Sequence, residues 1–120
     1  MTDAETTIAA IQKELKGFNE ERDWDQYHSP RNLAMALSVE ASELLELYLW
    51  STDNGPQPPV SSRLSKVEDE AADVLICLLN FCRHAQIDLA AAVETKMRKN
   101  AEKYPVEQVR GRMEKHSEYT

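Results

Sequence analysis

Apolar residues recur at helical spacing in four stretches of the chain, and turn-forming residues separate these stretches. We expect helices over about residues 3–20, 30–50, 61–86 and 88–104. Ser29 and Pro30 are typical of a helix start, Asp88 can cap the last helix, and Pro105 ends it. The pattern predicts an all-α domain of the four-helix-bundle type over residues 1–105, followed by a charged, flexible tail over residues 106–120.

The expected helix over residues 30–50 is apolar nearly all round. Several apolar side chains project outside its main stripe: Met35, Val39, Leu45 and Leu49. A helix with this pattern is buried on more than one side. In so small a domain, a second buried side indicates a subunit interface, so we expect an oligomer.

Two acidic pairs interrupt the apolar runs: Glu40 with Glu43, and Glu70 with Asp73. Residues three apart on a helix project roughly 60° from each other, so each pair shares a face. Carboxylates in an apolar run are costly unless a cation meets them, and four oxygen donors from two helices are a usual cradle for Mg²⁺ or Mn²⁺. Ordinary solvated helix faces remain the alternative, which the position of Glu40 inside the apolar stripe disfavours. The second pair begins a polar stripe that continues through Cys77, Asn80 and His84.

A polar line along the last helix offers groups suited to phosphate. Lys96, Asn100 and Tyr104 follow one another at intervals of four residues. A metal-bound polyphosphate needs cations and amide donors nearby, which this line can supply. A solvated basic helix end, favoured by the helix dipole, explains the pattern equally well.

Both tryptophans, Trp24 and Trp50, flank expected loops rather than the middle of helices. An aromatic ring at the mouth of a cleft can stack on a nucleobase. His28 could hydrogen-bond the base or the sugar. Packing of the loops onto the bundle explains these three residues at least as well.

Composition narrows the classes of function. The 120 residues carry a formal net charge of −7, which disfavours binding to a nucleic-acid polymer or to an anionic membrane. Cys77 and Cys82 lie on one expected helix and cannot pair with each other. No secretory signal and no stretch apolar enough to span a bilayer is visible. We therefore expect a cytoplasmic protein with reduced thiols.

Taken together, these segments resemble the MazG-like all-α nucleotide pyrophosphohydrolases, and in particular their dCTP pyrophosphatase branch. The resemblance extends over about residues 8–105. It is carried by ERDWDQYHSPRNL at residues 21–33, by ExxE at 40–43 followed by Glu46 and Trp50, by ExxD at 70–73, and by Lys96 and Asn100.

The resemblance implies a helical bundle that assembles as a homodimer or homotetramer. It implies Mg²⁺-dependent cleavage, with Mn²⁺ as a substitute, of a nucleoside triphosphate to the monophosphate and pyrophosphate. The favoured substrate is dCTP or a 5-substituted dCTP, and the role is house-cleaning of the nucleotide pool. Cys77 departs from this pattern, because close relatives carry tyrosine there.

Site residues carry over position by position from the same resemblance. The implied metal ligands are Glu40, Glu43, Glu70 and Asp73. Glu43 is also the candidate to orient the attacking water. The implied substrate contacts are Trp24, His28 and Trp50 at the base, and Lys96 and Asn100 at the phosphates.

Two other interpretations stay open. A non-catalytic helical adapter that dimerises through residues 30–50 and binds a partner with its tail explains the apolar helix but leaves Glu40 without a purpose. A sister activity on dUTP or phosphoribosyl-ATP would use the same fold. The tryptophan pair favours a stacked base without naming it.

Overall fold

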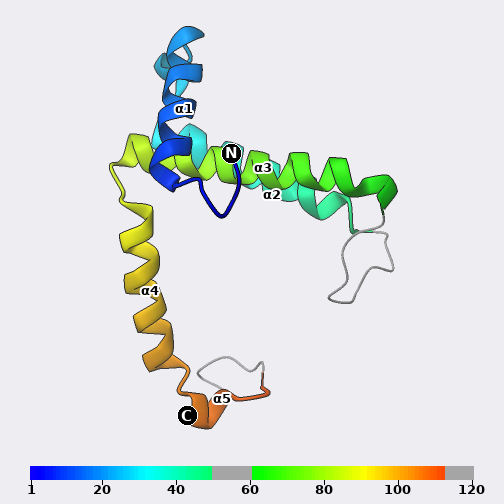
Figure 1. Cartoon of the computed structure of the whole chain (residues 1–120), viewed down its shortest axis with the longest axis vertical. Helices are drawn as coiled ribbons and strands as arrows, with labels where there is room; N and C mark the ends of the chain where they lie inside the picture. The colour runs from blue at the N-terminus through cyan, green and yellow to red at the C-terminus, as the bar shows by residue number, and fades with distance from the viewer. Residues whose placement is uncertain (50–60, 113–120) are drawn as a thin grey trace. The chain divides into compact units, whose positions relative to one another are not determined.

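The computed structural model describes residues 1–49 and 61–112, with side chains from residue 63 onward in the second range. Every regular element in these residues is helical, which confirms the all-α class. The elements are α1 (Ile8–Glu21), the 3₁₀ helix η1 (Asp25–Tyr27), α2 (Pro30–Glu46), α3 (Ser61–Ala85), α4 (Leu89–Lys103) and α5 (Val106–Val109) (Figure 1). The chain divides into two compact units, residues 1–87 and 88–120, and each is described by itself.

The first helix begins later than the sequence predicts. Thr7 caps it, because its hydroxyl oxygen accepts a hydrogen bond from the Ala10 amide at 3.1 Å. The residues before Thr7 form a separate turn, closed by the Thr6 amide on the Thr2 carbonyl at 2.8 Å. At the other end, Asp23 adopts a left-handed conformation with φ 54°, which ends the helix and turns the chain.

The predicted start of α2 is confirmed. The Ser29 hydroxyl oxygen accepts from the Asn32 amide at 3.1 Å, and Pro30 occupies the first turn. The α-helix ends at Glu46, earlier than predicted, and continues as tighter turns such as the Tyr48 amide on the Leu45 carbonyl at 2.9 Å. Trp50 and the predicted loop over residues 51–59 lie outside the described residues.

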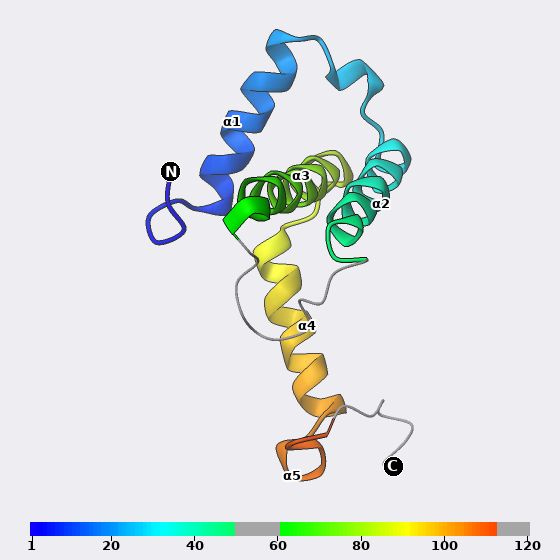
Figure 2. The same cartoon turned by 90° about the vertical axis from the view of Figure 1, so that its right-hand side faces the viewer.

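The central element of the first unit is α3. In Figure 2, α2 and α1 lie on different sides of it, and both contact it. The most deeply buried apolar side chains of the first unit are those of Leu33, on α2, and of Leu79 and Cys82, on α3. Four apolar residues of α2 and of the turns that follow it are each more than half exposed in the single chain: Met35, Val39, Leu45 and Leu49.

The end of α3 and the start of α4 follow local backbone chemistry. Gln86 has a left-handed φ of 58°, and the Ile87 amide closes back on the Cys82 carbonyl at 2.9 Å, so α3 ends there. In the second unit, the predicted cap of α4 is confirmed, because an Asp88 carboxylate oxygen accepts from the Ala91 amide at 3.0 Å. The short helix α5 follows Pro105, within the predicted tail.

The structure also describes the two cysteines and the apolar length of the helices. Cys77 and Cys82 are both free thiols, as predicted. Among the described residues, no single helix is long and apolar enough to cross a membrane, and only the bent pair of α3 and α4 reaches that length and composition together.

Candidate active site

Three of the predicted metal ligands converge between α2 and α3. Carboxylate oxygens of Glu40 and Glu43, from α2, and of Glu70, from α3, lie within 4.8 Å of one another. Asp73 follows Glu70 by three residues, and its negative charge contributes to raising the pKa values of Glu40 and Glu70. We call these four side chains the carboxylate cluster.

Among the described residues, no cation offsets the negative charge of the carboxylate cluster. Burial, followed by the hydrogen bond and charge of Glu43 and the charges of the other two acids, raises the pKa of Glu40 from 4.5 to about 7. Burial and then Glu43 likewise raise the pKa of Glu70. In the described part of the chain, none of the four acids forms an ion pair.

The donor set of the cluster suits a hard divalent cation. One oxygen of Glu40 and one of Glu70, both Oε2, are buried and have no hydrogen-bond partner among the described residues. Such oxygens are costly unless a proton or a cation meets them. The neighbouring Cys77 thiol stays protonated, because burial and the charges of Glu40 and Asp73 raise its pKa. The available ligands are therefore carboxylate oxygens, the type that Mg²⁺ and Mn²⁺ prefer.

A cleft of about 550 Å³ lies between α1, the segment after it, and α3. Its walls include Trp24 and His28, two of the predicted substrate contacts, together with Phe18 and Ile76. The Trp24 side chain is 45% exposed and stands edge-to-face with Phe18 at 5.7 Å between ring centroids. The volume falls in the range typical of small-molecule sites. The structure thus brings Trp24 and His28 to one cleft, while Trp50 lies outside the described residues.

The floor of the cleft carries a buried amide pair that is not among the predicted site residues. Asn19 Nδ2 donates to Asn80 Oδ1 at 3.1 Å, and the two residues are 3% and 6% exposed. Both line the cleft. Asn80 belongs to the polar stripe of α3. The sequence indicates Asn19 only weakly, as a polar residue four positions after Leu15 in an otherwise apolar stripe.

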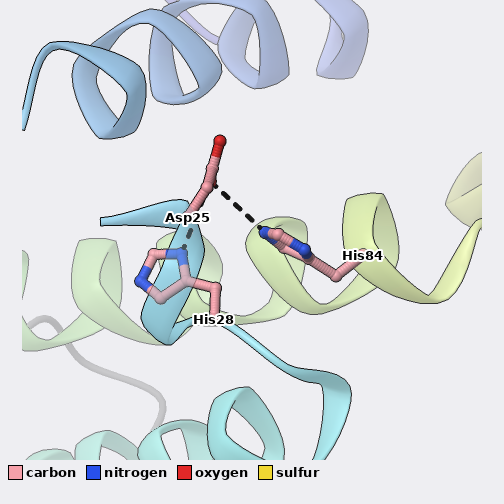
Figure 3. A group of neighbouring side chains, drawn as sticks. All are labelled: Asp25, His28 and His84. Atoms are coloured by element: carbon pink, nitrogen blue, oxygen red, sulfur yellow. Dashed lines mark ion pairs between the residues drawn. The ribbon is translucent and has the colours of Figure 1, made fainter. Parts of the chain in front are cut away.

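A second polar cluster joins η1 to the end of α3 (Figure 3). An Asp25 carboxylate oxygen, Oδ1, accepts from Arg83 Nη2 at 2.8 Å. The same oxygen lies 3.5 Å from His84 Nε2 and 3.9 Å from His28 Nδ1. We call these four side chains the Asp25 cluster; except for His28, none of them is a predicted site residue.

Charge in the Asp25 cluster is balanced. The hydrogen bond from Arg83 lowers the pKa of Asp25, with the nearby positive charges adding to the effect against some burial. Burial, followed by the charge of His84, lowers the pKa of His28. The cluster therefore ties the segment that carries Trp24 and His28 to α3 through an ionised carboxylate and a guanidinium.

The predicted phosphate contacts belong to the second unit. Lys96 is exposed and Asn100 is half-buried, both on α4. The Asn100 backbone carbonyl accepts from the Tyr104 amide at 2.8 Å. Because each unit is described by itself, the roles of these two side chains stay predictions.

Comparisons with known proteins identify the family of the chain. Residues 35–118 match the model of the MazG-like family. The chain is 40% identical over 109 residues to dCTP pyrophosphatase 1 of Mus musculus, covering 89% of this chain and 64% of that protein. It is 39% identical over 116 residues to dCTP pyrophosphatase 1 of Homo sapiens, covering 95% and 68%.

A solved structure provides the comparison of folds. A pyrophosphatase from Archaeoglobus fulgidus superposes with a TM-score of 0.71 at 36% sequence identity, covering 88% of this chain and 98% of that chain. The fold of the helical domain is therefore shared with that protein. The present chain spans 64% of the length of the mouse relative.

Proposed function

The chain belongs to the MazG-like family, and from this premise we propose that it is a nucleotide pyrophosphohydrolase. Addition of one water across the α–β phosphoanhydride of a deoxynucleoside triphosphate gives the monophosphate and pyrophosphate. The favoured substrate is dCTP or a 5-substituted dCTP, as the names of the relatives suggest, and the role is house-cleaning of the nucleotide pool. The observation that carries the proposal is the carboxylate cluster, with its two buried oxygens that lack a partner in the described residues.

Glu40, Glu43, Glu70 and Asp73 are the residues that would hold Mg²⁺, with Mn²⁺ as a substitute. A bound cation would neutralise triphosphate oxygens and lower the pKa of water. Two helices present the carboxylates from different sides, so their positions are fixed before substrate arrives. We assign Glu43 the further task of orienting the attacking water, because its carboxylate adjoins those of both Glu40 and Glu70.

The cleft supplies the site for the base. Trp24 offers an exposed indole for stacking, and His28 offers a polar group on the same wall. Asn80 follows Asp73 by seven residues on α3, about 10 Å along the helix axis, which leaves room for sugar and phosphates between base and acids. Trp50 at the base, with Lys96 and Asn100 at the phosphates, completes the proposed set of contacts.

We further propose that the functional form is a homodimer or homotetramer. Four large apolar residues of α2 and of the turns that follow it are each more than half exposed in the single chain: Met35, Val39, Leu45 and Leu49. Exposed apolar residues in such number favour a subunit interface. Light scattering at micromolar concentration should give a multiple of the 13.7 kDa chain mass. A stable monomer would contradict this part of the proposal.

The activity is tested with a panel of dCTP, 5-methyl-dCTP, dUTP and phosphoribosyl-ATP, with separate detection of pyrophosphate and phosphate. We expect pyrophosphate from dCTP or its 5-methyl derivative in the presence of Mg²⁺, and no release in EDTA. Release of phosphate alone, or turnover indifferent to EDTA, would overturn the proposal. A non-catalytic adapter would show neither turnover nor a rise in melting temperature with Mg²⁺.

A further inference from the structure

We propose that the Asn19–Asn80 amide pair is a specificity element that reads the hydrogen-bonding edge of the nucleobase in the cleft. The chemistry it selects is an exocyclic amino group beside a ring-nitrogen acceptor, the edge that cytosine presents. This inference rests on the proposed function and adds the residues that choose the base.

Each amide keeps one polar group free after the pair has formed. The bond uses Asn19 Nδ2 and Asn80 Oδ1, which leaves Asn19 Oδ1 as an acceptor and Asn80 Nδ2 as a donor. In the described residues neither free group makes another hydrogen bond, and neither is among the buried atoms that lack a partner, so both groups reach accessible surface. The cleft that both residues line provides that surface.

The pair is also fixed relative to the ring on which a base would stack. The Asn19 backbone carbonyl accepts from the Trp24 amide at 3.0 Å, so the amide and the indole belong to one closed turn. Asn80 lies within the long helix α3, one turn after Ile76, another residue of the cleft wall. Because the indole and both amides line the same cleft, we place the base on Trp24 with its edge toward the free groups.

With the base held in one orientation by its sugar and phosphates, the two free groups match an amino-bearing edge and oppose a keto-bearing one. In cytosine, the N4 amino group can donate to Asn19 Oδ1 while N3 accepts from Asn80 Nδ2. Uracil presents O4 and N3–H in the reverse order, which sets acceptor against acceptor and donor against donor. A buried site that leaves its polar groups unpaired rejects the mismatched ligand strongly. Adenine shares the amino and ring-nitrogen pattern, so dATP belongs in the test.

The decisive variant is Asn80→Asp. An aspartate oxygen still accepts from Asn19 Nδ2, but the free group changes from a donor to an acceptor at nearly constant volume. The added charge opposes every triphosphate alike, so the measured quantity is the ratio of kcat/KM for dCTP to that for dUTP. We expect this ratio to fall by about ten- to a hundredfold.

Gln12→Glu is the matched control, because it places the same charge on α1 at a residue that does not line the cleft. It should leave the ratio unchanged. If Asn80→Asp fails to fold, the double variant Asn19→Ala, Asn80→Ala removes both partners together. The ratio of kcat/KM for dCTP to that for dUTP should then approach the value of a site that does not distinguish the two base edges. The parallel comparison of dCTP with dATP separates recognition of the edge from recognition of base size.

The outcomes separate this inference from the proposed function. If the wild-type protein cleaves dCTP but a folded Asn80→Asp variant keeps the ratio, the pair is structural only and the inference is overturned. A wild-type preference for dUTP over dCTP would overturn it as well, because it requires the opposite order of free groups. If the wild-type protein cleaves no nucleoside triphosphate at all, the proposed function falls first and this inference falls with it.

Discussion

Two polar clusters share the helix α3, and they differ in how their charge is balanced. The carboxylate cluster gathers four acids without an ion pair in the described residues. The Asp25 cluster sets one carboxylate against the guanidinium of Arg83, with two imidazoles beside it. The carboxylate cluster keeps its repulsion, which indicates a binding site for a cation. In the Asp25 cluster the charges cancel, which indicates a structural joint between η1 and α3.

The difference matters because both clusters have a composition that can hold a metal. Donor atoms of Asp25, His28 and His84 also lie within 4.8 Å of one another. There, however, Arg83 already supplies a positive charge at 2.8 Å from the same carboxylate oxygen. A divalent cation would have to approach this guanidinium, whereas at the carboxylate cluster it would relieve repulsion.

The largest effect should come from removing one acid of the carboxylate cluster. Glu70→Gln is expected to lower turnover at least about a hundredfold, since even loss of an outer partner of a metal ligand commonly costs 10- to 100-fold. Steady-state pyrophosphate release at saturating Mg²⁺ measures it. The same loss is expected for Glu40→Gln, Glu43→Gln and Asp73→Asn.

Asp69→Asn is the matched control, because it removes the same charge from the neighbouring, exposed position of α3. It should keep near-normal turnover. Circular dichroism on both variants should show an unchanged helical content. If Glu70→Gln retained near-normal turnover, Glu70 could not be an essential ligand.

The sequence predicts the carboxylate cluster and misses the Asp25 cluster for a physical reason. Each acidic pair lies within one helix, so its geometry follows from helical spacing, and α2 and α3 follow each other in the chain. The Arg83–Asp25 and Asn19–Asn80 contacts join residues 58 and 61 positions apart. They depend on how α1 and η1 pack on α3, which no local pattern specifies.

Local sequence patterns also predict some helix ends correctly and miss others. Ser29 and Asp88 are correctly predicted as caps because the capping bond is local. Thr7 is missed, since acidic and apolar residues continue the helical pattern toward Asp3 while its hydroxyl begins the helix later. The end of α2 at Glu46 is also missed, because the apolar pattern runs on through the tighter turns.

The next largest effect should come from Trp24, which lies in the segment that the Asp25 cluster ties to α3. Trp24→Ala should weaken substrate binding by about 1–3 kcal/mol, the range for loss of one stacked base. Its stability cost should stay below the roughly 3–5 kcal/mol typical of a core tryptophan, because the side chain is 45% exposed. Isothermal titration calorimetry with dCMP measures the affinity of both proteins, and thermal melting measures their stability.

Tyr27→Ala provides the control for this prediction. Tyr27 is an exposed aromatic residue of η1 and does not line the cleft. Its removal should change neither affinity nor stability appreciably. A large loss of stability with unchanged affinity in Trp24→Ala would mean that Trp24 only packs the segment onto the bundle.

A smaller effect, of opposite sign at the two clusters, should appear in stability. Asp25→Asn removes a charge-assisted hydrogen bond that is partly buried, so it should lower the free energy of unfolding by about 1–2 kcal/mol. Glu40→Gln should leave the metal-free protein as stable as before or more so, since it relieves repulsion. Urea unfolding in EDTA measures both.

The Mg²⁺ dependence separates the clusters further. Asp25→Asn should still gain stability from Mg²⁺, because the carboxylate cluster is intact. Glu40→Gln should lose most of that gain. If Asp25→Asn abolished the response to Mg²⁺ while Glu40→Gln preserved it, the assignments of binding site and structural joint would have to be exchanged.

The smallest expected effect is a change in the pH dependence of stability without metal. The pKa of Glu40 rises from 4.5 to about 7 in the folded chain, so between these pH values the unfolded chain has lost a proton that the folded chain keeps. Raising the pH across this window therefore favours unfolding. The melting temperature in EDTA should fall by about 2–4 °C on account of Glu40, because solvent screening reduces the full effect of the shift to roughly 1 kcal/mol. Glu40→Gln should remove this part of the slope, whereas Glu46→Gln, at an exposed position of the same helix, should not.

His28 contributes to the pH dependence with the opposite sign. Its pKa is lowered in the folded chain, so below its usual value of 6.5 raising the pH favours folding. The quantity to compare is therefore the difference between wild type and Glu40→Gln. Identical slopes in wild type and Glu40→Gln would show that the carboxylates separate in solution and that their repulsion is not built into the fold.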